Sequence, residues 1–118
     1  MLARAERLHR QSFPTRRDFG KPGWEPPADV LETEEEVLIF IALPGVPIEN
    51  VEAAIEGGVL IISGKRVLPP QLRTARIHRL ELPQGCFERR IALPAGRYGG
   101  IGRAAKDGCL IISLRKAV

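Results

Sequence analysis

The sequence is poor in the residue types on which most catalytic and metal sites depend. It contains two histidines and two cysteines in 118 residues. Cys86 and Cys109 form no C-x-x-C pair and have no metal-ligand spacing. A nucleophile built from His78 and Cys86 is one alternative, but a surface histidine and a structural cysteine explain the two residues better. We therefore expect a protein that is not an enzyme and that holds no cofactor and no metal.

Long apolar runs are also missing. No run approaches the roughly 20 residues that cross a bilayer. Residues 1–10 alternate Leu and Ala with Arg and Glu, so they lack the apolar stretch of a secretory signal. These absences predict a cytoplasmic protein with no membrane partner, and the length fits one compact domain plus an arm.

Charge is abundant but unevenly placed. Residues 1–23 hold six Lys/Arg and two acidic residues, which accounts for the whole net charge of +4. Residues 24–56 hold nine acidic and no basic residues, whereas 57–118 hold twelve basic and three acidic ones. Opposite halves can assist folding or pairing between two copies. A pI of about 9.6 raises nucleic-acid binding as an alternative function. The aromatic content is 5%, and no basic strand alternates with stacking aromatics, so we expect no nucleic-acid partner.

From Trp24 onward the patterns are typical of strands. Residues 37–43 form an apolar run rich in β-formers, which Pro44 and Gly45 terminate. Helix signals are nearly absent, and Pro and Gly recur at short intervals, so the sequence predicts an all-β sandwich. The expected division is a flexible basic arm over 1–23 and one β-domain over 24–118. The expected strands are 28–33, 35–43, 51–56, 59–66, 76–82, 86–93, 101–106 and 109–115.

An internal repeat supports two similar pieces within one sandwich. A shift of 50 residues places residues 41–44 (Ile-Ala-Leu-Pro) on 91–94, and residues 60–63 (Leu-Ile-Ile-Ser) on 110–113. Two copies are too few for a solenoid. Segment 76–82 alternates more than the other strands and carries charge, which favours an exposed or projecting strand.

Four motifs in order resemble the small heat-shock proteins of bacterial type, which contain the α-crystallin domain. These are W-x-P-x-A-D-V from residue 24 with A-L-P-G-V from 42, then E-G-G-V-L-I-I-S-G-K-R from 56, F-x-R-x-I-x-L-P from 87 and A-A-K-D-G-C-L-I-I from 104. They span about residues 24–116. The resemblance implies an immunoglobulin-like antiparallel sandwich with a projecting loop strand, a homodimer and a role as a stress-response chaperone.

In that family the loop strand reaches over to pair with the partner's first strand. Carried onto this sequence, the resemblance implies a dimer interface formed by Asp29, Val30, Glu32, Arg76, Ile77, Arg79 and Leu80. The family usually continues into an extension with an I-x-I/V motif, which fills an apolar groove on a neighbouring dimer and builds larger oligomers. This sequence stops at Ala117 and Val118 without it. Assembly can therefore stop near the dimer, the arm and the groove can make another contact, or the extension is missing from this sequence.

A holdase, a chaperone that keeps unfolding proteins soluble, needs accessible apolar surface. We expect one client site in a groove near the sheet edge, where a client can add a strand, formed by Val51, Ala53, Ile55, Ile101 and Ala105. Core packing is the competing interpretation for each of them. A second expected client site is the arm, through Leu8, Phe13 and Phe19, although an inert tail is equally consistent.

The expected function is ATP-independent binding of unfolding or partly folded client proteins, because burial of client apolar surface supplies the free energy. The competing function is that of a co-chaperone-like sandwich that binds one folded partner. That type usually lacks the projecting strand, so segment 76–82 argues against it.

Overall fold

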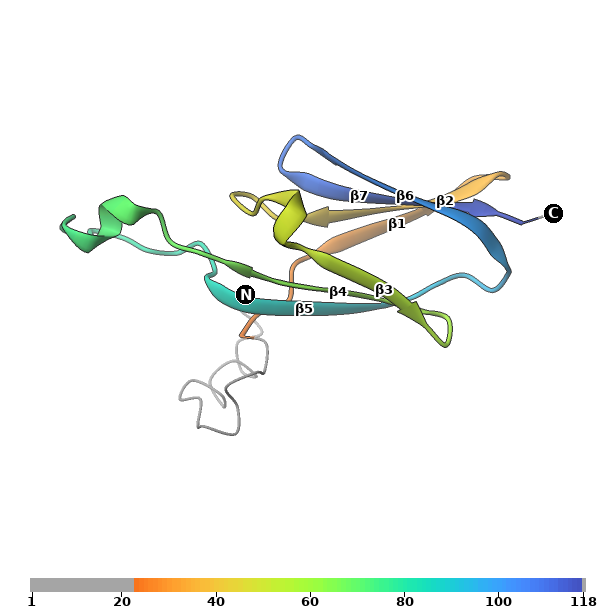
Figure 1. The fold of residues 1–118 in the computed structure, drawn as a ribbon, viewed down its shortest axis with the longest axis horizontal. Helices are drawn as coiled ribbons and strands as arrows, with labels where there is room; N and C mark the ends of the chain where they lie inside the picture. Colours follow the sequence, from red (N-terminus) through yellow and green to blue (C-terminus); the bar gives the residue numbers. More distant parts are fainter. Residues whose placement is uncertain (1–22, 118) are drawn as a thin grey trace.

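The computed structural model of the chain describes residues 23–117, and these fold into two antiparallel sheets. One sheet has four strands in the order β1-β2-β7-β6, and the other has three in the order β3-β4-β5. The sheets lie face to face as two layers (Figure 1). The strands are β1 (Ala28–Glu32), β2 (Glu36–Ala42), β3 (Glu52–Glu56), β4 (Val59–Arg66), β5 (Gly85–Ala92), β6 (Tyr98–Lys106) and β7 (Cys109–Lys116). The predicted all-β sandwich is confirmed.

The core lies between the two layers and is built by alternation along the strands. In β2, Val37, Ile39 and Ile41 are buried, while the residues between them are half-buried on the outer face. The same pattern holds in β4 and β7, because successive side chains of a strand point to opposite faces of the sheet. The uniformly apolar runs of the sequence thus bury one face fully and leave the other partly accessible.

The sequence repeat appears in the structure as two equivalent hairpins, β3–β4 and β6–β7. The strand that precedes each hairpin pairs with the last strand of the other hairpin. The β3–β4 hairpin turns at Gly57 and Gly58 with φ of 58° and 78°, and the β6–β7 hairpin turns at Asp107 and Gly108 with φ of 52° and 78°. Positive φ at both central residues is what a type I′ turn requires. β2 of the first half pairs with β7 of the second half, and β5 of the second half pairs with β4 of the first. These strand pairings between the two halves join them into one domain.

The predicted strand over 76–82 is wrong for the single chain. The connection between β4 and β5 contains a short 3-10 helix, η3 (Pro70–Arg73), followed by irregular backbone. It projects from the sandwich on the left of Figure 1. A strand forms only where a neighbouring strand accepts its hydrogen bonds, and this segment has none within the described chain.

The start of the domain is tied to β5. Gly23 N–H donates to the Cys86 carbonyl at 2.7 Å, and Trp24 Nε1 donates to the Gly85 carbonyl at 3.2 Å. The Trp24 ring also packs against Phe87 with centroids 5.0 Å apart. The predicted domain boundary after residue 23 falls at the edge of the described residues and stays a prediction.

Candidate functional site

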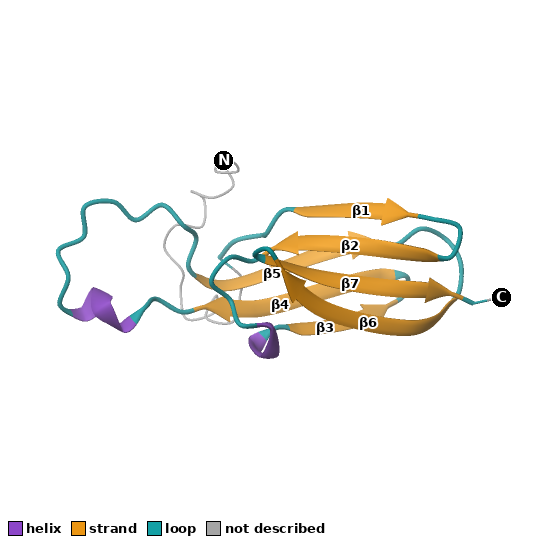
Figure 2. Ribbon diagram, turned by 90° about the horizontal axis from the view of Figure 1, so that it is seen from above, coloured by secondary structure: helices purple, strands orange, loops and turns teal. Residues whose placement is uncertain are grey.

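β3 and β6 are each the last strand of their sheet, and both lie on the same side of the sandwich (Figures 1 and 2). The gap between them is therefore an open edge of the two layers. A last strand presents backbone N–H and C=O groups that no neighbouring strand pairs. This edge can accept an added strand, in contrast to the closed interior between the sheets.

Strand register places the predicted groove residues on the inner faces of these two strands. Ala53 and Ile55 lie opposite the buried residues Ile62 and Leu60 of β4. Residues directly opposite in an antiparallel pair point to the same face of the sheet, so both point inward.

The same reasoning applies to β6. Ile101 and Ala105 lie opposite Leu114 and Leu110, which are also buried. The structure therefore brings the two pairs of predicted residues together across one gap.

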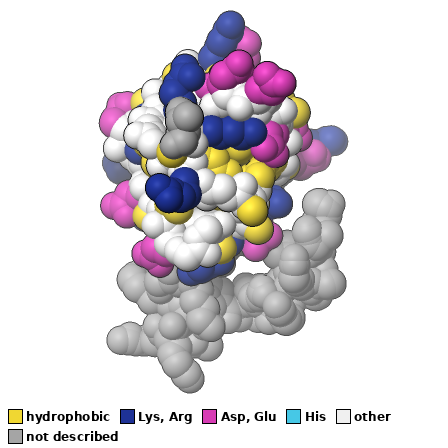
Figure 3. Space-filling model, turned by 90° about the vertical axis from the view of Figure 1, so that its right-hand side faces the viewer, with side chains coloured by type: hydrophobic (Ala, Val, Ile, Leu, Met, Phe, Trp, Pro, Cys, Tyr) yellow, Lys and Arg dark blue, Asp and Glu magenta, His cyan; other side chains and the backbone are white. Residues whose placement is uncertain are grey.

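The predicted groove residues differ in how far their side chains are exposed to solvent. Ile55 is 37% exposed and Ile101 is 61% exposed, so both offer apolar surface. Val51 is 4% exposed and belongs to the core, so for this residue the packing interpretation was the correct one. Its position differs from that of the others, because it lies between η2 (Ile48–Asn50) and β3, before the edge strand begins. Apolar side chains also reach the surface at the end where β3 stops and β6 begins (Figure 3).

Two hollows mark this edge, and Val51 borders both. The first has a volume of about 260 Å³ and lies between the β2–η2 connection and the β6–β7 hairpin. Its walls are almost wholly apolar and include Leu43, Val46, Ile48, Val51, Ala105 and Leu110. The second, of about 430 Å³, follows β3 and mixes apolar with charged residues, among them Ala53, Ala54, Glu52, Glu56 and Arg103.

Arg103 is the residue of this site that the sequence analysis missed. It lies on the inward row of β6 between Ile101 and Ala105. Its Nη2 donates to the carbonyl oxygens of Val51 at 2.6 Å and Ile48 at 3.1 Å. The side chain therefore links β6 to the η2 connection just before β3 begins. The alternation Ile101-x-Arg103-x-Ala105 already placed it on the same face as two predicted groove residues.

A second apolar surface is divided between β1 and the projecting loop. In β1, Val30 and Leu31 are exposed, and β1 is the last strand at the other edge of its sheet. The loop exposes further large apolar side chains, namely Val67, Leu68, Ile77, Leu80 and Leu82. The sequence-predicted interface residues of both segments are thus accessible. Within one chain the two segments form no strand pair, so the predicted pairing requires a second copy.

Charged residues of this second surface already have partners in the chain. Arg79 contacts Glu81 at 3.3 Å, and Lys116 contacts Glu32 at 2.7 Å. Arg66 ties the base of the loop to the body, since it donates to the Pro44 carbonyl at 3.0 Å and the Pro83 carbonyl at 3.3 Å.

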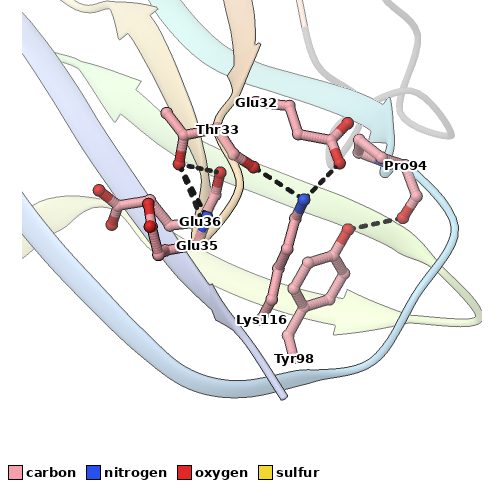
Figure 4. Close-up of polar contacts among 7 residues, drawn as sticks. All are labelled: Glu32, Thr33, Glu35, Glu36, Pro94, Tyr98 and Lys116. Atoms are coloured by element: carbon pink, nitrogen blue, oxygen red, sulfur yellow. Dashed lines mark hydrogen bonds and ion pairs between the residues drawn. The ribbon is translucent and has the colours of Figure 1, made fainter. Parts of the chain in front are cut away.

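Polar contacts fix the end of β7 against the β1–β2 turn (Figure 4). Lys116 Nζ donates to the Thr33 carbonyl at 2.8 Å and forms the ion pair with Glu32. Thr33 Oγ1 accepts from the backbone N–H groups of Glu35 at 3.2 Å and Glu36 at 3.0 Å. These acidic residues shape a turn, and among residues 23–117 no three His, Cys, Asp or Glu side chains gather as metal ligands.

Two further expectations concern other parts of the chain. Leu8, Phe13 and Phe19 of the predicted arm lie outside the described residues. Within residues 23–117, no helix has the length and apolar character needed to cross a membrane.

Comparisons with known proteins agree on one family. Residues 29–118 match the sequence model of the Hsp20/alpha crystallin family. Spore protein SP21 of Stigmatella aurantiaca is 34% identical over 98 residues, which cover 82% of this chain and 58% of that protein. Small heat shock protein C4 of Rickettsia felis is 30% identical over 106 residues, which cover 89% of this chain and 64% of that protein. The chain thus spans about three fifths of the length of these relatives.

Solved structures show the same fold. HspA from Xanthomonas axonopodis superposes with a TM-score of 0.71 at 33% identity, covering 79% of this chain and 94% of that one. Heat shock protein 16.0 from Schizosaccharomyces pombe gives a TM-score of 0.71 at 29% identity, covering 78% and 86%. The sandwich fold is therefore shared with these proteins.

Proposed function

Because this chain belongs to the Hsp20/alpha crystallin family, we propose that it is an ATP-independent chaperone that binds unfolding proteins and prevents their aggregation. The observation that carries the proposal is the open edge between β3 and β6, where exposed apolar side chains lie beside strands that end their sheets. An extended client segment can add to such an edge through backbone hydrogen bonds. It can bury its apolar side chains against Ile55 and Ile101, at about 25 cal/mol per Å² of apolar surface.

The experiment that tests this function is light scattering of a heat-labile enzyme, heated alone and with an equimolar amount of this chain in the absence of nucleotide. Suppressed scattering is the expected result, and added ATP should leave it unchanged. Unsuppressed scattering from a folded sample would contradict the proposed function.

A pair of variants locates the client site. Ile55→Asp places a charge in the groove, whereas Ala92→Asp places the same charge on the outer, exposed face of β5, away from both hollows. We expect the Ile55 variant to protect clients less well and the Ala92 variant to behave as wild type. Equal protection by both would remove the groove as the client site. Val51 is unsuitable for such a test, because a charge at this core position would destabilise the fold.

The homodimer belongs to the same proposal. The edge of β1 and the apolar residues of the projecting loop are the two halves of the expected interface, with segment 76–82 of each copy adding to β1 of the other. The register of β4 and β5 offers a clean deletion, because Arg66 and Gly85 lie directly opposite each other at the base of the loop. Replacing residues 67–84 with Asn-Gly should close β4 and β5 as a hairpin and leave the sandwich folded.

We expect the loop-deleted chain to be a monomer in sedimentation analysis. Arg90→Ala, which removes one exposed ion pair on β5 outside the two interface segments, should remain a dimer. Dimers that persist after the deletion would rule out the strand exchange. We propose that the protein works in the cytoplasm without a cofactor.

A further inference from the structure

Arg103 is a charged residue in an otherwise apolar row of the groove. On β6 it lies opposite Ile112 of β7, whose side chain is in the core, so Arg103 also projects inward. Its row neighbours are Ile101 and Ala105. The guanidinium donates to the carbonyl oxygens of Val51 and Ile48, which lie in the connection that leads into β3, at 2.6 and 3.1 Å. A positive charge therefore lies at the surface that would receive a client, between β6 and the start of β3.

The two carboxylates that border the second hollow come from the outer face of β3. Glu52 and Glu56 lie on the opposite face of β3 from Ala53 and Ile55, because side chains alternate along a strand. Lys106 lies on the outer face of β6 for the same reason. Among the described residues that point inward on these two strands, Arg103 alone carries a charge.

A segment that pairs with the edge of β6 meets this side chain, since Arg103 lies on the inward row of that strand. A wholly apolar segment would cover the guanidinium without offering it an acceptor, which costs the desolvation of a charged donor. A carboxylate would replace two neutral acceptors with anionic ones and so add the attraction of an ion pair. The planar guanidinium can make two parallel hydrogen bonds to its two oxygens.

We infer that this groove selects extended segments of unfolding proteins in which a carboxylate lies between two apolar side chains, in the order apolar–x–acidic–x–apolar. The spacing follows from Ile101, Arg103 and Ala105, which present an apolar, a cationic and an apolar contact at alternate positions of one strand. The inference rests on the proposed function and assigns the chemistry of its ligand.

The test is a direct binding measurement with three fluorescein-labelled peptides. They share the central sequence Val-Thr-X-Thr-Val, in which X is Glu, Gln or Leu. Fluorescence anisotropy with the whole chain should show the Glu peptide binding about tenfold more tightly than the Gln peptide, a difference of about 1.4 kcal/mol. The Leu peptide should bind most weakly.

Variants assign this preference to one residue. Arg103→Met keeps the length of the aliphatic stem but loses the charge, and it should bind the Leu peptide most tightly. Arg103→Lys keeps the charge and should retain a preference for Glu. Lys106→Met removes a charge from the outer face of the same strand and should leave the wild-type order unchanged. Circular dichroism melting of each variant confirms that it is folded.

The outcomes separate this inference from the proposed function. Equal affinity of wild type for the Glu and Gln peptides would refute the selection for a carboxylate while leaving the groove as a binding site. A Glu preference that Arg103→Met and Lys106→Met reduce equally would reflect general charge attraction, which also refutes the role of Arg103. Binding of none of the peptides would refute the groove as a peptide site. The chaperone function itself would then be decided by the light-scattering assay.

Discussion

Replacing Gly64 with alanine measures how closely β4 packs against its neighbours beside the groove. Gly64 lies opposite Phe87 of β5. A Cβ at this position would lie 2.7 Å from Phe87 Cζ and 3.0 Å from the Asn50 carbonyl oxygen. Carbon atoms pack best at about 3.5–4.0 Å, so the ring would have to move by close to 1 Å. Phe87 is 1% exposed and is held against Trp24, which leaves it little room.

The expected loss follows from two opposing contributions. Overpacking a core typically costs about 1–3 kcal/mol. Alanine also reduces the conformational freedom of the unfolded chain, which stabilises by about 0.4–1 kcal/mol. The free energy of unfolding should therefore fall by about 1–2 kcal/mol. In a domain of this size each 1 kcal/mol moves Tm by about 4–8 °C, so Tm should drop by about 5–15 °C.

The assay is thermal and urea unfolding followed by circular dichroism, with Gly100→Ala as the matched control. A Cβ at Gly100 meets no atom within 4 Å, so this variant should be as stable as wild type or slightly more stable. Phe87→Leu removes the ring atom nearest to the new Cβ, so the Gly64→Ala cost should be smaller in that background. If Gly64→Ala and Gly100→Ala melted at the same temperature, Gly64 would not be closely packed against Phe87. Since Asn50 ends η2 at the wall of the first hollow, the same variant should also alter the groove.

The remaining predictions concern the turns and the surface. Lys116→Met removes the contacts of Nζ with Glu32 and with the Thr33 carbonyl, and it should lower the free energy of unfolding by about 0.5–1.5 kcal/mol, measured by urea unfolding. Asp107→Val places a β-branched residue at a φ of 52° and should lower the free energy of unfolding by about 1–3 kcal/mol. Asp107→Gly should be nearly neutral. Equal urea midpoints for the two variants would refute the strain argument. Arg79→Ala, in an exposed ion pair, should change stability by less than about 0.5 kcal/mol, and a larger loss would show that the pair is not merely superficial.

The family, the fold class and most strands could be predicted from sequence because their signals are local. The apolar run of β2 ends at a proline, and those of β4 and β7 each begin directly after a glycine. The turn residues at 57–58 and 107–108 are those that a two-residue hairpin requires. The repeat identified two equivalent hairpins. It did not reveal that their neighbouring strands are exchanged, because exchange depends on contacts between residues far apart in the chain.

The groove as a client site stays a prediction, but the structure places its residues. Ala53, Ile55, Ile101 and Ala105, chosen as apolar residues near the sheet edge, lie on the inner faces of β3 and β6. Sequence cannot tell a covered residue from an uncovered one, so the prediction grouped the buried Val51 with the exposed Ile101. The missed Arg103 follows from the same limit, because a basic residue in a strand is ordinarily taken to face solvent.

The sequence by itself therefore determined the strands, the tight turns and the family, since each depends on the conformational preferences of residues within a few positions of one another. Tertiary structure decided which apolar side chains the second layer covers and where the charge of Arg103 lies. It also decided that segment 76–82 forms no strand within a single chain. The physical reason is common to all three: burial and backbone pairing are properties of two surfaces in contact, and a strand's own residues specify only one of them.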